Sequence, residues 1–370
     1  MAQNKGYGYE AYKEAYDRLG SVKAVAREFG VHHSTVSASL NGGRRQDPAI
    51  QRAMDAVGTG LVPPLAWIKT KATADSPGFS VMVRPQQETP EAIAERVKAT
   101  LEGMEPAALV PPPEYTDADL CTALLISDAH IGLQSWAKET GEAYNTDIAA
   151  ERLKSWVGQL VAASPPSGLC VILDNGDLTH ADDHTNMTPA SKHVLDVDTR
   201  HFRTLDVTVE TLACAIELAL AKHQRVLVRI LPGNHNRESY ITILFALAER
   251  FRDNPRVTVQ KVPGEFFAFE WGKVMLAAHH GDKAKADRLV HFLADQYAEM
   301  WGRTRHRFLF TGHLHHSKSQ DIGGCTWEQL RAVTARDAYA VAHGYTARAQ
   351  LQAITFHKER GEVQRVKVNA

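Results

Sequence analysis

Short apolar runs alternate with longer amphipathic stretches from about residue 119 to the end of the chain. The runs predict buried strands and the stretches predict helices, because strands and helices repeat their apolar positions with different periods. The predicted strands are Ala123 to Ile126, Leu169 to Leu173, Val226 to Leu231, Val274 to Ala278 and Phe308 to Phe310. The predicted helices are Ile148 to Val161, Thr204 to Leu220 and Ile241 to Arg252, and Leu351 to His357 with Val363 to Val368 predicts a hairpin. We therefore expect residues 119–370 to form one α/β domain.

The first 55 residues have the period of short helices. Tyr9 to Leu19 predicts one helix, Ser21 is expected to cap a second from Val22 to Phe29, and Ser34 a third that reaches Leu40. Residues 56–118 are rich in proline, which interrupts regular structure, and contain one predicted helix from Thr89 to about Gly103. The sequence thus predicts a small all-α domain (1–55), a connector (56–118) and the α/β domain (119–370).

Composition restricts the classes of protein. Lys and Arg total 42 against 43 Asp and Glu, so any polyanion must be bound by a local patch and not by bulk charge. The 4 cysteines form no C-x-x-C pair, which argues against a zinc ribbon or a disulfide framework. The sequence shows neither an apolar leader nor a stretch long enough to span a membrane, so we expect a soluble cytoplasmic protein without a membrane partner.

A polar motif follows each predicted buried strand. In order these are Asp128-x-His130, Gly176-Asp177, Gly233-Asn234-His235, His279-His280-Gly281 and Gly312-His313-Leu314-His315. Loops at the carboxyl ends of strands converge in α/β sheets, so these side chains should meet at one place. Imidazole nitrogens and hard oxygens without thiolates suit Mn²⁺, Fe or Zn²⁺. The donors are too many for one tetrahedral ion, but two ions about 3.5–4 Å apart would use them all and hold a hydroxide for phosphoryl transfer.

These five motifs, over about residues 120–320, resemble the five blocks of the calcineurin-like metallophosphoesterase superfamily. The resemblance implies a four-layer sandwich of two mixed sheets flanked by helices, and a metal-dependent phosphoesterase. It implies two divalent ions, with Mn²⁺ favoured and Fe, Zn²⁺ or Ni as alternatives. The implied ligands are Asp128, His130 and His315 for the first ion, Asp177 between the ions, and Asn234, His313 and either His279 or His280 for the second.

The resemblance also implies two catalytic histidines. His235 would lie beside the substrate and stabilise phosphoryl oxygens or protonate the leaving oxygen. Gly176 to His180 resembles a stretch of the nuclease subunit of SbcCD-type exonucleases, which makes His180 the second candidate. Asn236 stands where the superfamily often has Asp or Glu, so no carboxylate there orients His235. Tyr345 and Arg348 belong to a segment that could close over the site.

The amino-terminal helices carry a second pattern. Ala26, Gly30, Val31, Val36 and Leu40 have the spacing of a helix-turn-helix, and residues 35–41 resemble the second helix of the lac repressor family. The resemblance implies that His32, His33, Ser34, Thr35 and Ser37 face the major groove and that Arg44 and Arg45 contact phosphates. A protein-docking module is the alternative, and a single unit would need dimerisation to a homo-oligomer, or a tethering role, to read a sequence.

Together the two patterns predict a two-metal phosphodiesterase that acts on DNA. The arrangement also resembles phosphoesterases encoded by bacteriophages, which would place the protein in the host cytoplasm. One alternative is the same chemistry on cyclic nucleotides, nucleotides or phosphoproteins. The other is a DNA-binding regulator whose metal domain is structural.

Overall fold

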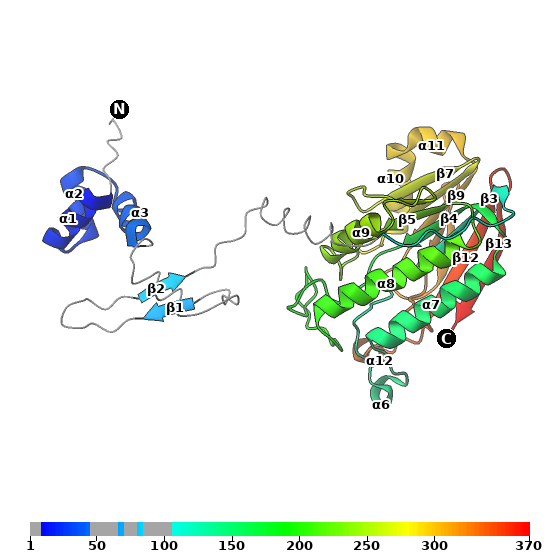
Figure 1. Cartoon of the computed structure of the whole chain (residues 1–370), viewed down its shortest axis with the longest axis horizontal. Coiled ribbons are helices and arrows are strands. Elements are labelled where there is room, and N and C mark those ends of the chain that lie inside the picture. The colour runs from blue at the N-terminus through cyan, green and yellow to red at the C-terminus, as the bar shows by residue number, and fades with distance from the viewer. Residues whose placement is uncertain (1–8, 45–65, 70–79, 84–105) are drawn as a thin grey trace. The chain divides into compact units, whose positions relative to one another are not determined.

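The computed structural model describes residues 9–44, 66–69, 80–83 and 106–370. Contacts divide the chain into two units, Met1–Arg96 and Val97–Ala370. Figure 1 labels their helices and strands, and each unit is described by itself.

The first unit contains three helices where the sequence predicts them: α1 (Tyr9–Leu19), α2 (Val22–Phe29) and α3 (His33–Arg44). Their shared core includes the buried side chains of Tyr12, Val25, Ala26, Val36 and Leu40. Gly30 ends α2 with φ of 65°, a left-handed conformation that glycine adopts without strain. The small side chain of Ala26 and the turn at Gly30 therefore allow the helices to pack closely.

The predicted caps of these helices differ in detail. Ser21 precedes α2 but its side chain makes no capping hydrogen bond. Ser34 lies inside the first turn of α3, and the ring of His32 accepts the Ser34 N–H at 3.4 Å in place of the predicted serine cap. Helix α3 also extends beyond the predicted end at Leu40.

The predicted connector contains strand structure that the proline pattern hides. Strands β1 (Ala66–Lys69) and β2 (Ser80–Val83) pair antiparallel. Each is only four residues long, too short for a clear alternation of apolar and polar positions. The predicted helix from Thr89 to Gly103 lies outside the described residues.

The second unit is built on two mixed sheets. The first has the order β13-β12-β3-β4-β5-β6, in which β3 to β6 are parallel and β12 is antiparallel to both neighbours. Its strands are β3 (Asp117–Ile126), β4 (Ser167–Asp174), β5 (Val226–Ile230), β6 (Val257–Val259), β12 (Gln350–His357) and β13 (Gly361–Asn369). The predicted carboxy-terminal hairpin corresponds to β12 and β13.

The second sheet has the order β10-β11-β9-β8-β7, with β8, β9 and β11 parallel. Its strands are β7 (Phe267–Trp271), β8 (Val274–Ala278), β9 (His306–Thr311), β10 (Lys318–Ile322) and β11 (Cys325–Gln329). β10 is an edge strand whose side chains are mostly exposed, so it lacks the apolar run by which β8 and β9 were predicted. Strands β7 and β11 were not predicted either.

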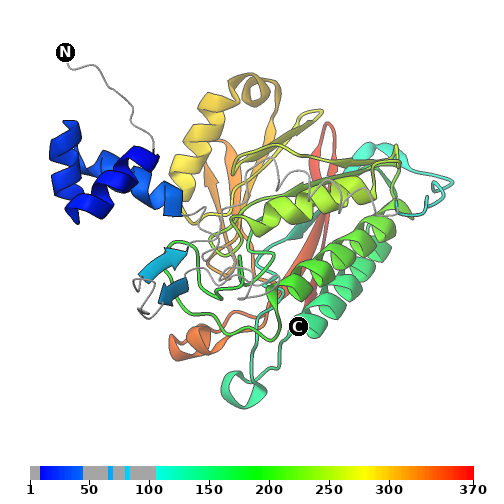
Figure 2. The same cartoon turned by 60° about the vertical axis from the view of Figure 1, so that its left-hand side comes forward.

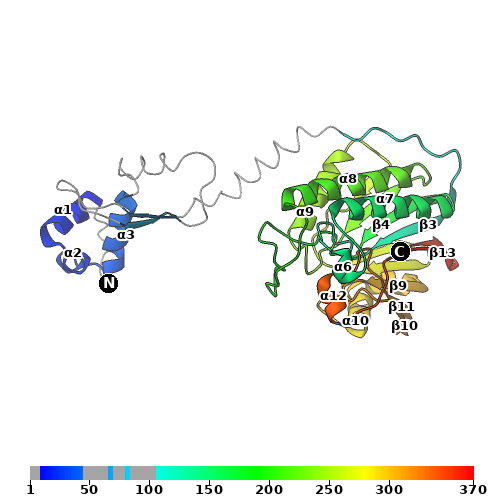
Figure 3. The same ribbon diagram turned by 90° about the horizontal axis from the view of Figure 1, so that it is seen from below.

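Helices cover the outer face of each sheet. On the six-stranded sheet these are α7 (Thr146–Ala163), α8 (His201–Leu220) and α9 (Ser239–Arg250), and α7 and α8 lie side by side (Figures 1 and 2). On the five-stranded sheet α10 (Ala286–Gln296) and α11 (Ala298–Arg303) pack. Two short helices, α6 (Ala137–Thr140) and α12 (Ala338–Ala342), lie next to each other (Figure 3). Within the described ranges, no helix combines the length and apolar character that crossing a bilayer requires.

Alternation along the central strands holds these layers together. In β3, Leu124 and Ile126 pack against the helices, whereas Ala123 and Leu125 face the second sheet. Phe310 of β9 fills the space between the sheets from the other side. The predicted four-layer sandwich of two mixed sheets flanked by helices is thus confirmed.

Candidate metal centre

The five polar motifs lie at the carboxyl ends of five strands. Asp128 and His130 follow β3, Asp177 follows β4, and Asn234 and His235 follow β5. In the other sheet, His279 and His280 follow β8, and His313 and His315 follow β9. Strands β3, β4 and β5 are parallel, as are β8 and β9, so each sheet delivers its motifs at one edge.

Strained backbone is concentrated in these motifs. Of the seven described residues other than glycine with positive φ, five are candidate ligands: Asp128, His130, Asp177, His313 and His315. Each such residue costs about 1–3 kcal/mol and persists where packing over-determines it, typically at functional sites. The fold therefore holds these side chains in place at a cost in conformational free energy.

The first group of donors comprises Asp128, His130 and His315, whose ligand atoms lie within 4.8 Å of one another. Nε2 of His315 is 3.3 Å from Oδ1 of Asp128 and 3.4 Å from Nε2 of His130. Two imidazole nitrogens that face each other at this distance cannot both carry a proton there. A cation between these atoms would satisfy both lone pairs.

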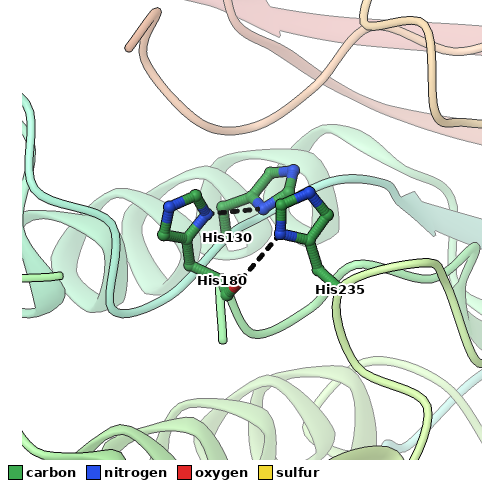
Figure 4. A group of neighbouring side chains, drawn as sticks. All are labelled: His130, His180 and His235. Carbon is green, nitrogen blue, oxygen red and sulfur yellow. Dashed lines mark hydrogen bonds between the residues drawn. The ribbon is translucent and has the colours of Figure 1, made fainter. Parts of the chain in front are cut away.

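His180 and His235 extend this group (Figure 4). Nδ1 of His180 is 3.2 Å from Nδ1 of His130, on the side of the ring opposite His315. If the His130 Nδ1–H donates to His180, Nε2 of His130 is left as a lone-pair donor toward His315 and Asp128. His235 in turn uses Nδ1 to contact the carbonyl oxygen of His180 at 2.7 Å. The three rings therefore form one oriented chain.

The second group comprises Asp177, His280 and His313. Nδ1 of His280 donates to the carbonyl of Asn175 at 2.8 Å, and this bond directs Nε2 toward Oδ2 of Asp177 at 3.1 Å and Oδ1 of Asn234 at 3.0 Å. A backbone carbonyl behind an imidazole is the usual outer support of a metal-binding histidine. Two oxygens and one nitrogen thus converge on the place that a cation would take.

The structure distinguishes the two adjacent histidines after β8. His280 lies in the second group, but His279 points elsewhere, with Nε2 3.7 Å from Oε2 of Glu265 and its ring against Phe266. The prediction that left both histidines as ligand candidates therefore narrows to His280. The alternating strand period explains the difference, because successive side chains leave β8 on opposite faces.

Asn236 has a role that the sequence did not reveal. Its Oδ1 accepts hydrogen bonds from the N–H groups of Gly233 at 2.7 Å and Asp177 at 3.1 Å, so it ties the loops after β4 and β5 together. The orientation that a carboxylate would give His235 comes from the carbonyl of His180. His235 is therefore oriented even though Asn236 supplies no carboxylate.

The glycines of the motifs give the ligands room. A Cβ on Gly233 would overlap the side chain of Asp177 and approach its backbone N to 2.5 Å. A Cβ on Gly312 would lie 2.5 Å from Oδ2 of Asp128 and would also overlap Ser127. Both glycines are therefore required by close approach of the chain to a candidate ligand.

The buried carboxyl groups and imidazoles change each other's pKa. Burial opposes ionisation of Asp128 and Asp177, yet neighbouring histidines lower the pKa of Asp128, and His280 holds the pKa of Asp177 well below its usual range. Burial likewise opposes a charge on His280, but Asp177 and Asp128 raise its pKa to about 10. Burial and the neighbouring His235 lower the pKa of His180 to about 3. A cation is therefore favoured beside Asp177 and disfavoured on His180.

Asp174, the last residue of β4, is a buried carboxyl group that the sequence analysis did not single out. Neither of its carboxyl oxygens has a hydrogen-bond partner among the described residues. Burial raises the pKa of Asp174 well above its usual range, with Asp128 and Asp177 adding to the effect. Burial of Asp174 therefore disfavours a negative charge on this side chain beside the candidate ligands.

A cavity of about 970 Å³ opens over both groups. His130, Asp177, His235, His313 and His315 line one part of it. Residues of the segment from Arg331 to Ala349, Tyr345 and Arg348 among them, line another part of it, and closure of this segment over the site stays a prediction. Apart from Tyr345 and Arg348, the residues of this segment were not predicted from the sequence, because they follow no predicted strand.

The residues predicted to contact DNA lie in the first unit. His32, His33, Ser34 and Thr35 are exposed, and Ser37 is half-buried. His32 and His33 contact each other through Nδ1 atoms 3.2 Å apart. Arg44 is the last residue of α3, and Arg45 lies outside the described residues. Contact with DNA stays a prediction for all seven.

Comparison with known proteins finds similarity to solved structures but none to family models or curated sequences. No protein-family model and no curated protein matches the chain. Among solved structures, a predicted phosphoesterase from Streptococcus pneumoniae is 11% identical, with a TM-score of 0.29 over 69% of this chain and 100% of that chain. An archaeal phosphodiesterase is 10% identical, with a TM-score of 0.34 over 67% and 99% of the two chains. Vps29 in complex with zinc from Entamoeba histolytica is 13% identical, with a TM-score of 0.27 over 67% and 98%. Because these scores lie below 0.5, we base the function on this chain's own residues.

Substitution of Gly233 by alanine should disrupt the second group by steric overlap with Asp177. We expect metal affinity to fall about 10- to 100-fold, as for other disturbed supports of metal ligands, with the far-ultraviolet circular dichroism unchanged. Metal bound after equilibrium dialysis measures the effect. Gly302→Ala is the matched control, because a Cβ there meets nothing within 4 Å. Full metal binding by the Gly233→Ala variant would contradict the assignment.

Metal binding should release a proton from His280. Its pKa of about 10 means that it is protonated near neutral pH without metal, so a cation must displace the proton. The apparent affinity for the metal should rise with pH up to about pH 10, and calorimetry in buffers of different ionisation enthalpy should show the release of the proton.

Without metal, the raised pKa of His280 stabilises the fold below about pH 6.5, and this stabilisation is lost as the pH rises through about 10. His279→Gln should release the same number of protons, and binding without proton release would refute the assignment.

Proposed function

We propose that this chain is a two-metal phosphodiesterase of the calcineurin-like superfamily and that its substrate is DNA. One observation carries the proposal: donors from five strand ends form two neighbouring ligand groups on one cavity. The donor set contains imidazoles, carboxylates and an amide oxygen but no thiolate, which suits Mn²⁺ first, with Fe, Zn²⁺ or Ni as alternatives.

In this proposal Asp128, His130 and His315 hold the first ion. Asn234, His280 and His313 would hold the second, and Asp177 would serve both. A bound pair of divalent ions lowers the pKa of water and neutralises charge on phosphoryl oxygens. The protein's part is to fix the ligands, since the strained loops and the carbonyl behind His280 leave them little freedom.

His235 is the residue that acts on the substrate. Its Nδ1 is anchored on the carbonyl of His180, which leaves Nε2 on the ring edge, and the side chain lines the cavity. From that position the imidazolium form, which carries a proton on Nε2 as well as on Nδ1, can donate a hydrogen bond to a phosphoryl oxygen or a proton to the leaving sugar oxygen. His180 supports His130 and His235 from behind.

DNA is the proposed substrate because of the first unit. Its exposed residue His32 directly precedes α3, and the exposed His33, Ser34 and Thr35 begin it, the position from which a helix-turn-helix contacts base edges. Binding there would raise the local concentration of DNA for the second unit. Ser37, Arg44 and Arg45 complete the proposed contacts, and dimerisation would add the surface that one such unit lacks.

Asp177→Asn should abolish hydrolysis. The bridging position loses its charge, so we expect activity on DNA and on bis(p-nitrophenyl) phosphate with Mn²⁺ to fall by more than about 10²-fold. Labelled single- and double-stranded DNA and the small ester are assayed together. The matched control is Asp183→Asn, an exposed carboxylate outside the cavity that accepts hydrogen bonds from the N–H and hydroxyl of Thr185. Hydrolysis of the ester without any cleavage of DNA would refute the nuclease proposal, and full activity of the Asp177→Asn variant would favour a regulator with a structural metal domain.

His235→Asn should separate catalysis from metal binding. We expect kcat on DNA to fall about 10²- to 10⁴-fold, because the proton donor is lost while the ligands remain. Metal analysis should give the same content as in the parent protein. His291→Asn, at an exposed histidine of α10 outside both ligand groups and the cavity, is the matched control and should retain the parent kcat. A parallel loss of metal in His235→Asn would make His235 a ligand instead.

A further inference from the structure

One wall of the cavity has a chemistry that the metal centre does not use. It consists of the aromatic residues Tyr339, His343 and Tyr345 with Arg331, Arg336 and Arg348, which we name the aromatic wall. All except His343 line the same cavity as His235 and Asp177. A ligand whose phosphate lay at the metal centre would therefore have the aromatic wall beside its neighbouring nucleotides.

The three rings of the aromatic wall are stacked. The ring centroids of Tyr339 and His343 are 4.0 Å apart with an interplanar angle of 31°, and those of His343 and Tyr345 are 6.0 Å apart at 25°. Tyr339 and Tyr345 nonetheless leave 59% and 57% of their surface exposed. Two large exposed rings that both contact His343 offer flat faces to a further planar group.

The local backbone holds this stack in place. Asp337 caps α12 by accepting the Ala340 N–H at 2.7 Å. Gly344, with φ of 73°, turns the chain back so that Tyr345 N–H donates to the Ala340 carbonyl at 2.9 Å. Nδ1 of His343 contacts the carbonyl of Tyr339 at 2.8 Å, which fixes the middle ring. The stack is thus formed before any ligand binds.

The charge of the aromatic wall is positive and largely unpaired. None of the three arginines forms an ion pair with a carboxylate within the described part of the chain. Nε of Arg331 is buried and lacks a hydrogen-bond partner there. Arg336 donates only to the carbonyls of Thr140 and Tyr345. Apart from Asp177 of the metal centre, the facing carboxylate on the cavity is Asp337, which is occupied as the cap of α12.

We propose that the aromatic wall binds an unpaired stretch of DNA next to the scissile phosphate, so that the enzyme prefers single-stranded substrate. Bases stack on Tyr339 and Tyr345, and the flanking phosphates contact Arg331, Arg336 and Arg348. Single strands are favoured because a duplex keeps the faces of its bases stacked on each other, whereas an unpaired base presents its face to a ring. This proposal rests on the phosphodiesterase function proposed above.

Substitution of Tyr339 or Tyr345 by leucine tests the stack. We expect each substitution to raise KM for a single-stranded oligonucleotide of about eight nucleotides roughly tenfold, a length that falls within the range such sites cover. The ratio of kcat/KM on that oligonucleotide to kcat/KM on bis(p-nitrophenyl) phosphate should fall by the same factor. Tyrosine to phenylalanine at either position should retain the parent KM, because stacking needs the ring and not the hydroxyl. Tyr115→Leu, at a tyrosine that is 70% exposed and lies outside the cavity, is the matched control.

Binding without cleavage distinguishes this proposal from the function on which it rests. In full-length Asp177→Asn protein, fluorescence anisotropy of the labelled oligonucleotide should show roughly tenfold weaker binding when Tyr345→Leu is added. The same oligonucleotide in duplex form can also bind the first unit, so it is compared by its response alone: its binding should not change with Tyr345→Leu. If leucine changes neither KM nor binding, the aromatic wall is refuted while hydrolysis by the parent upholds the phosphodiesterase. If the parent hydrolyses no ester but leucine still weakens binding of single strands, the phosphodiesterase fails and the binding wall stands.

Discussion

Buried ligand atoms that lie within hydrogen-bond distance of one another are the constraint on which the second unit depends, because a proton or a cation must lie between them. Nε2 of His130 and of His315 lie 3.4 Å apart, and Nε2 of His280 lies about 3 Å from two oxygens. Burying such groups without a donor or a cation between them is costly. The neighbouring layers of the sandwich hold them there nevertheless, because each donor sits on a strand end that two apolar cores fix. A divalent cation bound between these atoms would offset this cost and stabilise the folded state.

The same constraint explains how the loops are built. Five candidate ligands have positive φ, and Gly233 and Gly312 are required by the side chains of Asp177 and Asp128. Strain of this kind is tolerated only where the surrounding structure leaves no alternative. Asn236 supplies part of that restraint by bonding the loops after β4 and β5 to each other. The ligand geometry is therefore a property of the whole sheet edge and not of single residues.

Sequence patterns predicted the structure correctly where it depends on neighbouring residues in the chain. The buried runs predicted β3, β4, β5, β8 and β9, and the polar motifs behind them predicted which side chains would meet. Patterns failed where a function depends on backbone groups or distant segments. The carbonyl of His180 that orients His235, and that of Asn175 behind His280, carry no sequence signal. The edge strand β10 has no buried face, and the wall around Tyr339 has no strand end to mark it.

The two histidines first considered as catalytic are separated by their surroundings. His180 is buried, its Nδ1 faces His130, and burial with the nearby His235 lowers its pKa to about 3, so it remains neutral when a leaving oxygen needs a proton. His235 is half-buried and lines the cavity with Nε2 unengaged by the contact that fixes Nδ1. A proton donor must reach the substrate and exchange its proton near working pH. Both side chains line the cavity, but the lowered pKa of His180 conflicts with the second requirement, so we assign His180 a positioning role toward the neighbouring rings.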